Sequence, residues 1–436
     1  MPVGKLPPEL RSKVLEYRSE ESDLVAATHV CQYWRATLVS NPSLWNRIKV
    51  LSRRNLDQPL TYLKRSKSVL IDVYVNVWPS KTRHTLKRLA SHIQRTKSLE
   101  IHGYPTNIPA TSFLFHDSVL SLQQLKIHSY EPNPVGLPDD FFDKQLSSLH
   151  SVTFEGTFPA LSSPPPFPNL TRFELILDGG LLPRISLLFQ FLSCCPRLRK
   201  IRVKVHDFLE DGSRDDPPDR IISLGFLTDL DYNCNTVSRI LPCLNLPRLE
   251  RLRVDKWANQ TQELADILPH NSSAFLAGVT KMQYRVDRQL HGIIEFSADR
   301  TNISLVATPP VDLFSDGSPI PFRQIEDLEI KGDSTTTGLP IIPIDTFKNL
   351  RILRVNPSDV RFSVQACRSL LPGAGIPCPS LREIQYSRYL DPLTNLAEAR
   401  FRVGHRLGLV QLKHIPENWQ GSVEELREFV DEVLVE

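Results

Sequence analysis

The sequence has no long apolar run and no cysteine pair of the kind that binds zinc. Its 436 residues contain no apolar stretch of about 18 residues, which a membrane-spanning helix needs. The first residues, MPVGKLPPELRSK, contain no apolar core of a signal peptide. The seven cysteines form no C-x-x-C pair, and no histidine follows them at zinc-finger spacing. These absences predict a protein of the cytoplasm, the nucleus or both, without membrane association or a structural metal.

Signatures of catalysis and of phosphate binding are missing too. The sequence contains no G-x-S-x-G, P-loop, G-x-G-x-x-G, H-E-x-x-H or kinase-type H-R-D motif. His102 and His128 each follow a strand-like phrase (LEIH and LKIH), so we expect them near one another on adjacent strands. Two stacked surface histidines are more often incidental than metal ligands. We therefore predict a non-enzymatic protein that uses no cofactor.

Charge is unevenly distributed along the chain. Residues 1–100 carry 18 Lys+Arg against 8 Asp+Glu, whereas the whole chain has a net charge of only +3. A basic first quarter raises the hypothesis of nucleic-acid binding. However, the basic residues of 81–97 surround apolar residues at helical spacing, which is typical of the solvated face of an amphipathic helix. No RNP signature or glycine-rich basic tract accompanies them, so nucleic-acid binding is disfavoured.

The first 45 residues contain a compact block of short amphipathic segments. LPPELRSKVLEY begins with residues suited to a helix start and places Leu10 and Val14 on one face. A second helix is predicted with an apolar side running from Leu24 to Trp34. Asn41-Pro42 then breaks the chain before a third short segment. Three short helices of this size are marginal alone, so the block must pack against something else.

The pieces of this block, in their order and spacing, resemble the F-box over residues 4–48. The matching pieces are Leu6-Pro7-Pro8-Glu9-Leu10, Asp23-Leu24, Val30-Cys31, Trp34-Arg35 and Pro42-Ser43-Leu44-Trp45. The resemblance implies docking onto the Skp-type adaptor of a cullin–RING ubiquitin ligase, through apolar anchors rather than charges. One departure is Arg18, which stands where the pattern carries an apolar residue near the end of the first helix.

The motif match makes ten residues candidates for binding the adaptor. They are Leu6, Pro7, Leu10, Val14, Leu15, Val30, Cys31, Trp34, Leu44 and Trp45. Some of them must instead hold the three helices together, and the sequence alone does not divide the two roles. The alternative hypothesis is that the whole block only caps the core of the adjacent domain.

A short phrase with apolar residues at its first, fourth and sixth positions recurs through the rest of the chain. It occurs as LQQLKI, LHSVTF, LTRFEL, LRKIRV, LTDLDY, LERLRV, VTKMQY, IEDLEI, LRILRV and LREIQY. With one weak member near Asn302, the mean step from Leu122 to Leu381 is about 26 residues, and this period with this phrasing is the signature of leucine-rich repeats. Stacked repeats bury a continuous core that no single repeat could bury.

The predicted fold class is therefore an α/β repeat. A short N-terminal helical F-box precedes an irregular, leucine-rich-repeat-like solenoid with parallel strands on its concave face. The predicted domains are the F-box (1–50), a connecting segment (51–68), the solenoid (69–415) and a C-terminal capping helix (416–436). An ordinary α/β domain whose strands look alike is the alternative.

Basic residues at exposed positions of the phrases form a candidate target-binding set. Its members are Arg199, Lys200, Arg202, Arg251, Arg253, Arg351 and Arg354. Such residues suit an acidic or phosphorylated segment of a target protein, although solvated strand charges are the simpler explanation. Two polar, proline-containing stretches, 211–219 and 308–321, are predicted surface insertions.

The chain as a whole resembles the F-box proteins common in mushroom-forming fungi. The resemblance implies a substrate-recognition subunit of an SCF-type ubiquitin ligase, in which the F-box binds the adaptor and the repeats bind an unidentified target protein. Other subunits would carry out the transfer of ubiquitin. A leucine-rich-repeat scaffold or inhibitor, whose N-terminal helices only cap the solenoid, is the alternative from another class.

Overall fold

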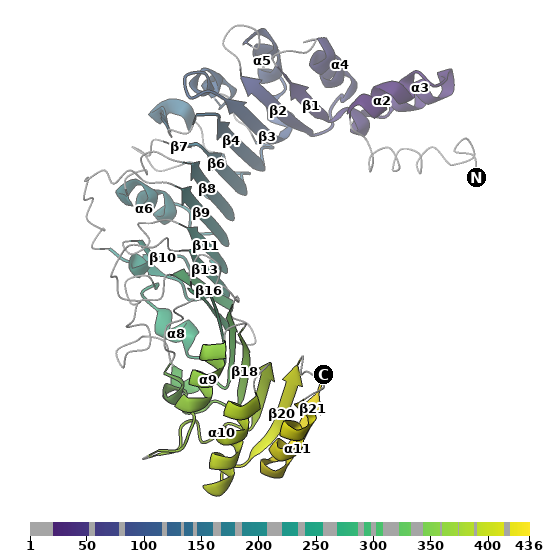
Figure 1. Ribbon diagram of the computed structural model, residues 1–436. Coiled ribbons are helices and arrows are strands. Elements are labelled where there is room, and N and C mark those ends of the chain that lie inside the picture. The colour runs from purple at the N-terminus through teal and green to yellow at the C-terminus, as the bar shows by residue number, and fades with distance from the viewer. Residues whose placement is uncertain are drawn as a thin grey trace. The chain divides into compact units, whose positions relative to one another are not determined.

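The computed structural model divides the chain into two compact units, Met1–Asp215 and Asp216–Glu436. Figure 1 shows the elements of both. The structure describes residues 21–51, 57–77, 83–115, 120–131, 135–142, 146–159, 167–178, 185–206, 220–233, 240–255, 268–286, 292–297, 302–307, 322–332, 343–357, 360–373, 375–387, 390–413 and 419–436. The predicted insertions at 211–219 and 308–321 lie outside these ranges.

The first unit begins with short helices that lead directly into a sheet. The elements are α2 (Glu21–Thr28), α3 (Gln32–Ser40), the 3-10 helix η2 (Pro42–Trp45), β1 (Arg47–Val50) and α4 (Asp57–Arg65). Asn41 ends α3, and its side chain accepts a hydrogen bond from the Ser43 backbone N–H at 3.2 Å, which starts η2. The break predicted at Asn41-Pro42 is confirmed.

A parallel sheet makes up the rest of the first unit, and its strands follow one another in chain order. They are β1, β2 (Ile71–Val77), β3 (Thr96–Gly103), β4 (Gln124–Ser129), β6 (Ser151–Glu155), β8 (Arg172–Asp178) and β9 (Lys200–His206). Alternate residues are buried, as in β2, because successive side chains point to opposite faces of a strand. Parallel neighbours require a crossover connection between them.

The crossovers of the first unit lie on one side of this sheet (Figure 1). They contain α5 (Arg83–Ala90), η3 (Ile93–Arg95), η4 (Ile108–Phe115), η5 (Asp139–Phe142), α6 (Ile185–Ser193) and the short pair β5 (Val135–Leu137) and β7 (Thr157–Pro159). Phenylalanines fill the space between crossovers and sheet. The Phe115–Phe141 ring centroids are 5.2 Å apart, and those of Phe173 and Phe191 are 4.4 Å apart. One face of the sheet therefore builds the core.

The second unit also pairs its strands largely in parallel. Its strands are β11 (Asp229–Asn233), β13 (Arg251–Asp255), β14 (Lys281–Val286), β15 (Gly292–Ser297), β16 (Asn302–Ala307), β17 (Asp327–Gly332), β18 (Ile352–Pro357), β19 (Glu383–Ser387), β20 (Leu407–Lys413) and β21 (Val430–Val435). The accompanying elements are the pair β10 (Ile222–Ser223) and β12 (Leu244–Asn245), η6 (Leu241–Cys243), α8 (Ser272–Leu276), η9 (Phe322–Gln324), η10 (Ile344–Thr346), α9 (Val360–Ser369), α10 (Leu390–Arg402) and α11 (Gln420–Phe429).

The strands of the second unit depart from chain order at one place. β13 pairs in parallel with β16, and β15 then pairs antiparallel with both β16 and β14. β14 in turn pairs in parallel with β17. Two extra strands thus stand between β13 and β14. The weak phrase near Asn302 is a strand of the sheet, as predicted, but it lies out of sequence order.

Every recurring phrase falls on a strand, and the parallel sheet is confirmed. The first, fourth and sixth residues of LQQLKI, which are Leu122, Leu125 and Ile127, are at most 2% exposed. The same positions of LRILRV, which are Leu350, Leu353 and Val355, are at most 3% exposed. The finer assignment to leucine-rich repeats stays a prediction.

The C-terminal stretch is only partly helical. The helix α11 ends at Phe429, and the backbone of Val430 is extended, with φ −125° and ψ 149°. The chain then continues as β21, which pairs in parallel with β20. Valines favour strands, and the sequence VDEVLV supplies three of them. The expected helix over 416–436 is therefore a helix followed by a strand.

Because Trp45 is 1% exposed, we expect Trp45→Ala to destabilise the protein by about 3–5 kcal/mol. The indole Nε1–H, which donates to the Leu38 carbonyl at 2.8 Å, would be lost with the ring. Urea denaturation measures the change in the free energy of unfolding. The control is Val30→Ala, because Val30 is 68% exposed and its truncation is expected to cost under about 0.5 kcal/mol. Equal effects of the two substitutions would contradict this account.

Candidate functional site

The predicted second helix of the N-terminal block is two helices in the structure. The helix α2 ends at Thr28, and the Cys31 backbone is extended, with φ −160° and ψ 167°. The Cys31 thiol accepts a hydrogen bond from the backbone N–H of Trp34 at 3.5 Å and so caps α3. Val30 and Cys31 consequently lie in an exposed turn between the helices, and not on a continuous apolar stripe.

Two of the candidate adaptor-binding residues hold the block together. Leu44 and Trp45 are 6% and 1% exposed. The Trp45 ring centroid lies 5.0 Å from that of Tyr62 on α4, and the Arg65 guanidinium lies 4.3 Å from the Trp45 ring centroid. Trp45 thus packs η2 against α4, and the burial of Leu44 and Trp45 leaves neither side chain available to a partner.

Other candidates remain accessible at the turn between α2 and α3. Val30 is 68% exposed, Cys31 is exposed and Trp34 is half-buried. Tyr33, which sequence reasoning did not select, is 52% exposed beside them. The remaining five candidates lie outside the described residues, as does Arg18. They are Leu6, Pro7, Leu10, Val14 and Leu15.

The N-terminal block is joined to the sheet of the first unit through β1, the last element of the block. β1 pairs in parallel with β2, with Ile48 opposite Val73 and Val50 opposite Val75. Ile48 and Val50 are fully buried. The segment that follows the helices is therefore the first strand of the sheet.

Comparison with protein families identifies this block. Residues 3–50 match the family model of F-box-like domains. The match supports an F-box protein, and it covers α2, α3, η2 and β1. No curated protein matches the chain.

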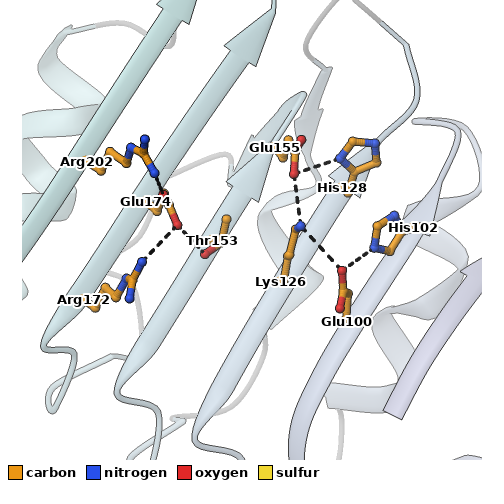
Figure 2. Close-up of polar contacts among 9 residues, drawn as sticks. All are labelled: Glu100, His102, Lys126, His128, Thr153, Glu155, Arg172, Glu174 and Arg202. Atoms are coloured by element: carbon orange, nitrogen blue, oxygen red, sulfur yellow. Dashed lines mark hydrogen bonds and ion pairs between the residues drawn. The ribbon is translucent and has the colours of Figure 1, made fainter. Parts of the chain in front are cut away.

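A second candidate surface is the polar face of the first sheet, opposite its buried side chains. The strand registers align one row of side chains across it, which we call the central row. It consists of Tyr74, Glu100, Lys126, Thr153, Glu174 and Arg202. The next row along the strands begins with Asn76, His102, His128 and Glu155. Figure 2 shows two groups of polar contacts on this face, one among Glu100, His102, Lys126, His128 and Glu155 and the other among Thr153, Arg172, Glu174 and Arg202.

The first group centres on Lys126. Its Nζ lies 3.5 Å from Glu100 Oε1 and 3.3 Å from Glu155 Oε2. Burial lowers the pKa of Lys126, but the two carboxylates outweigh burial and leave it raised. Burial raises the pKa of Glu155, but His128 and Lys126 outweigh it and leave it lowered. Both charges are thus stabilised by their neighbours.

Two histidines extend this group, as the sequence predicted. The rings of His102 and His128 lie on adjacent strands with centroids 4.8 Å apart. His102 Nε2 lies 2.6 Å from Glu100 Oε1, and His128 Nδ1 lies 3.0 Å from Glu155 Oε2. Burial lowers the pKa of His102, although the hydrogen bond to Glu100 opposes this. No group of three or more His, Cys, Asp or Glu side chains in the described ranges is arranged to hold a metal ion.

The second group centres on Glu174, which is 8% exposed. Arg202 donates to Glu174 Oε1 at 2.9 Å, and Thr153 Oγ1 donates to Oε2 at 3.3 Å. Arg172 Nη2 lies 3.7 Å from the same Oε2. A carboxylate this far from water needs such partners, because an unpaired buried charge is strongly destabilising.

The seven candidate target-binding residues are divided between the two units. Arg199, Lys200 and Arg202 lie on or just before β9 in the first unit, and the others lie in the second. Arg202, Arg251 and Arg354 each pair with a carboxylate of a neighbouring strand, and Arg351 lies 3.6 Å from Glu326 Oε2. The sequence showed the arginines, but their acidic partners become apparent only when the strands are aligned. None of the helices within the described ranges has both the length and the apolar character needed to cross a membrane.

The lowered pKa of Glu155 predicts a pH-dependent contribution to stability. A carboxyl whose pKa is lower when folded stabilises the fold above its unfolded pKa of about 4.3, and this stabilisation is lost as the pH falls through the folded value. We expect Glu155→Gln to lower the free energy of unfolding at pH 7 and to make little difference below about pH 3. Urea denaturation at a series of pH values measures both.

The control for this pH dependence is Glu424→Gln, which removes an exposed carboxylate from α11 whose ion pair spans only three residues. Exposed pairs of this kind contribute little. A constant difference between the wild type and Glu155→Gln from pH 7 to pH 3 would contradict the assignment.

Proposed function

We propose that the protein is the substrate-recognition subunit of an SCF-type ubiquitin ligase. The observation that carries the proposal is the F-box-like match over residues 3–50. Such domains bind Skp-type adaptors, which connect them to a cullin–RING ligase. The exposed turn between α2 and α3 supports the proposal, because Val30 presents an apolar side chain that the block itself does not bury.

In this function the protein carries out no chemistry. F-box proteins are typically non-catalytic adaptors. The F-box would hold the chain on the ligase, and the sheets would hold a target protein near the ubiquitin-carrying enzyme. Such tethering acts by raising the effective concentration of the target's lysines at that enzyme.

The sheet is the proposed target-binding part, and in the first unit its described crossovers lie on one side and leave the polar face to other molecules (Figure 1). The seven basic candidates, Arg199, Lys200, Arg202, Arg251, Arg253, Arg351 and Arg354, are retained as a predicted contact for an acidic or phosphorylated segment. The carboxylates beside several of them would compete with such a segment. Binding by these residues therefore requires a target that outcompetes the internal ion pairs.

The alternative function is a scaffold or inhibitor without a ligase. The pairing of β1 with β2 is the observation behind it, since a block that only caps the sheet would be joined in this way. Adaptor binding separates the two hypotheses, because a cap has no reason to bind a Skp-type protein.

We expect the full chain to bind a purified Skp-type adaptor and Val30→Asp to weaken this binding by about tenfold or more. A carboxylate at this position would be buried without a partner in the complex. Because Val30 is 68% exposed, the substitution is expected to leave the melting temperature unchanged. Isothermal titration calorimetry measures the affinity.

The matched control is Val403→Asp, at a valine that is 46% exposed in the second unit. It should bind the adaptor as the wild type does. A folded wild-type chain that shows no binding would exclude the ligase function, and equal weakening by both substitutions would exclude the turn as the docking point.

A further inference from the structure

Five aromatic rings gather at one end of the polar face in the first unit. We call them the ring cluster, and its members are Tyr74, His102, Tyr104, His128 and Tyr130. The ring centroids of Tyr74 and His102 are 4.7 Å apart, and those of His128 and Tyr130 are 5.3 Å apart. Tyr104 meets Tyr130 edge-on at 5.8 Å. The cluster therefore spans three adjacent strands and the residues that directly follow two of them.

The outer rings of this cluster face solvent. Tyr104 and Tyr130 are 38% and 40% exposed, and because their rings lie beside one another they form a shared accessible aromatic surface. Burial and the neighbouring Tyr130 raise the pKa of Tyr74 to about 12, which shows how far this inner ring is withdrawn from water. The cluster combines a sheltered inner part with two accessible tyrosines.

Negative charge borders the ring cluster. Glu100 and Glu155 contact its histidines and share a single ammonium, that of Lys126, so two carboxylates stand against one lysine here. The side chains of Glu100 and Glu155 keep 36% and 26% exposure. The exposed Glu131, directly after Tyr130, adds a further carboxylate. The aromatic surface is thus acidic at its margin, although the chain as a whole carries +3.

We propose that the ring cluster binds an arginine side chain of the target protein. A guanidinium is attracted to an aromatic ring when it lies within about 6 Å of the centroid, and its planar fork also pairs with a carboxylate. Tyr104 and Tyr130 supply the rings, Glu131 directly after Tyr130 supplies a carboxylate, and Glu100 and Glu155 add negative charge at the histidines of the cluster. Arginine fits this combination better than lysine, whose ammonium is compact and strongly hydrated.

The protein already uses the same contact within its own fold. Arg65 lies 4.3 Å from the Trp45 ring centroid, and Arg406 lies 5.3 Å from that of Phe401. At the ring cluster the rings and acids are present, and Tyr130 keeps 40% of its surface exposed to an arginine from another molecule. The proposal names a target feature and so rests on the proposed function for the source of that arginine.

Three labelled peptides of equal length test the proposal. Each has a Gly/Ser backbone with three identical charged residues, which are arginine, lysine or glutamate. Fluorescence anisotropy with the full chain, without adaptor, measures binding at physiological salt. We expect the arginine peptide to bind more tightly than the lysine peptide and the glutamate peptide not to bind. Equal binding of the arginine and glutamate peptides, or no arginine-peptide binding up to millimolar protein, would overturn the proposal.

Variants then place the contact on the cluster. Tyr130→Leu and Tyr104→Leu keep apolar volume but remove a ring, and each should weaken arginine-peptide binding about two- to fivefold. Tyr130→Phe keeps the ring and should bind nearly as the wild type does. Phe226→Leu removes a ring of similar exposure, 47%, in the other unit and should change nothing. Unchanged binding in Tyr130→Leu, with an unchanged melting temperature, would overturn the proposal.

The same protein samples are titrated with the Skp-type adaptor, so that the two hypotheses fail separately. A chain that binds the adaptor but not the arginine peptide loses this inference and keeps the proposed function. A chain that binds the arginine peptide through the ring cluster but not the adaptor keeps the site and loses the ligase.

Discussion

The structure depends on the backbone ladder between short parallel strands. A single short strand cannot satisfy its own backbone hydrogen bonds or bury its own apolar face. In the first unit, β2, β3 and β4 each pair with the next strand of the sheet, which the following crossover brings alongside. The ladder begins at β1, which belongs to the F-box-like segment, so the N-terminal block depends on the sheet for its last element. Trp45 and Tyr62 reinforce the same junction by packing on one another. The block that is proposed to bind the ligase is thus built into the body that is proposed to bind the target.

The same ladder organises the charges. Parallel registers bring equivalent positions of neighbouring strands side by side. An acidic residue on one strand therefore pairs with a basic residue on the next strand, although the two are far apart in the sequence. Glu174 has Arg202 on one side and Thr153 on the other, each more than twenty residues away in sequence. Lys126 lies between Glu100 and Glu155 in the same manner. These pairs stabilise the polar face, and they also leave its aromatic end with an acidic margin.

Much of the fold could be predicted from the sequence because burial has a local signature. The phrase L-x-x-L-x-L marks alternate inward positions, and Leu125 and Ile127 are buried as that spacing requires. The exchange of strand order around β14, β15 and β16 could not be predicted, because hairpin and crossover compete there and only tertiary packing decides between them. The strand β21 was missed for a related reason. Val430 and Leu434 lie at helical spacing, which favours a helix. The valine-rich segment instead pairs with β20, because valine favours strands and pairing forms backbone hydrogen bonds with that strand.

The candidate site shows the same division. The ordered F-box pieces were visible in the sequence, and so was the neighbourhood of His102 and His128, since both follow equivalent strand phrases. The sequence could not show which apolar residues of the motif are buried and which are exposed. Leu44 and Val30 are both apolar members of the motif. Leu44 is a buried residue of η2, whereas Val30 is exposed in the turn before Cys31, which caps α3. Similarly, the acidic partners of the arginines lie on other strands, and only the register reveals them.

The central claim is that the first 50 residues bind the ligase while the polar face of the sheet remains available to a target. Hydrogen–deuterium exchange of the full chain, with and without a Skp-type adaptor, tests this claim most directly. We predict that the adaptor slows exchange in the segment up to η2 and leaves β3, β4, β6 and β8 unchanged. Protection spread over those strands, or no change anywhere in a folded chain, would contradict the account.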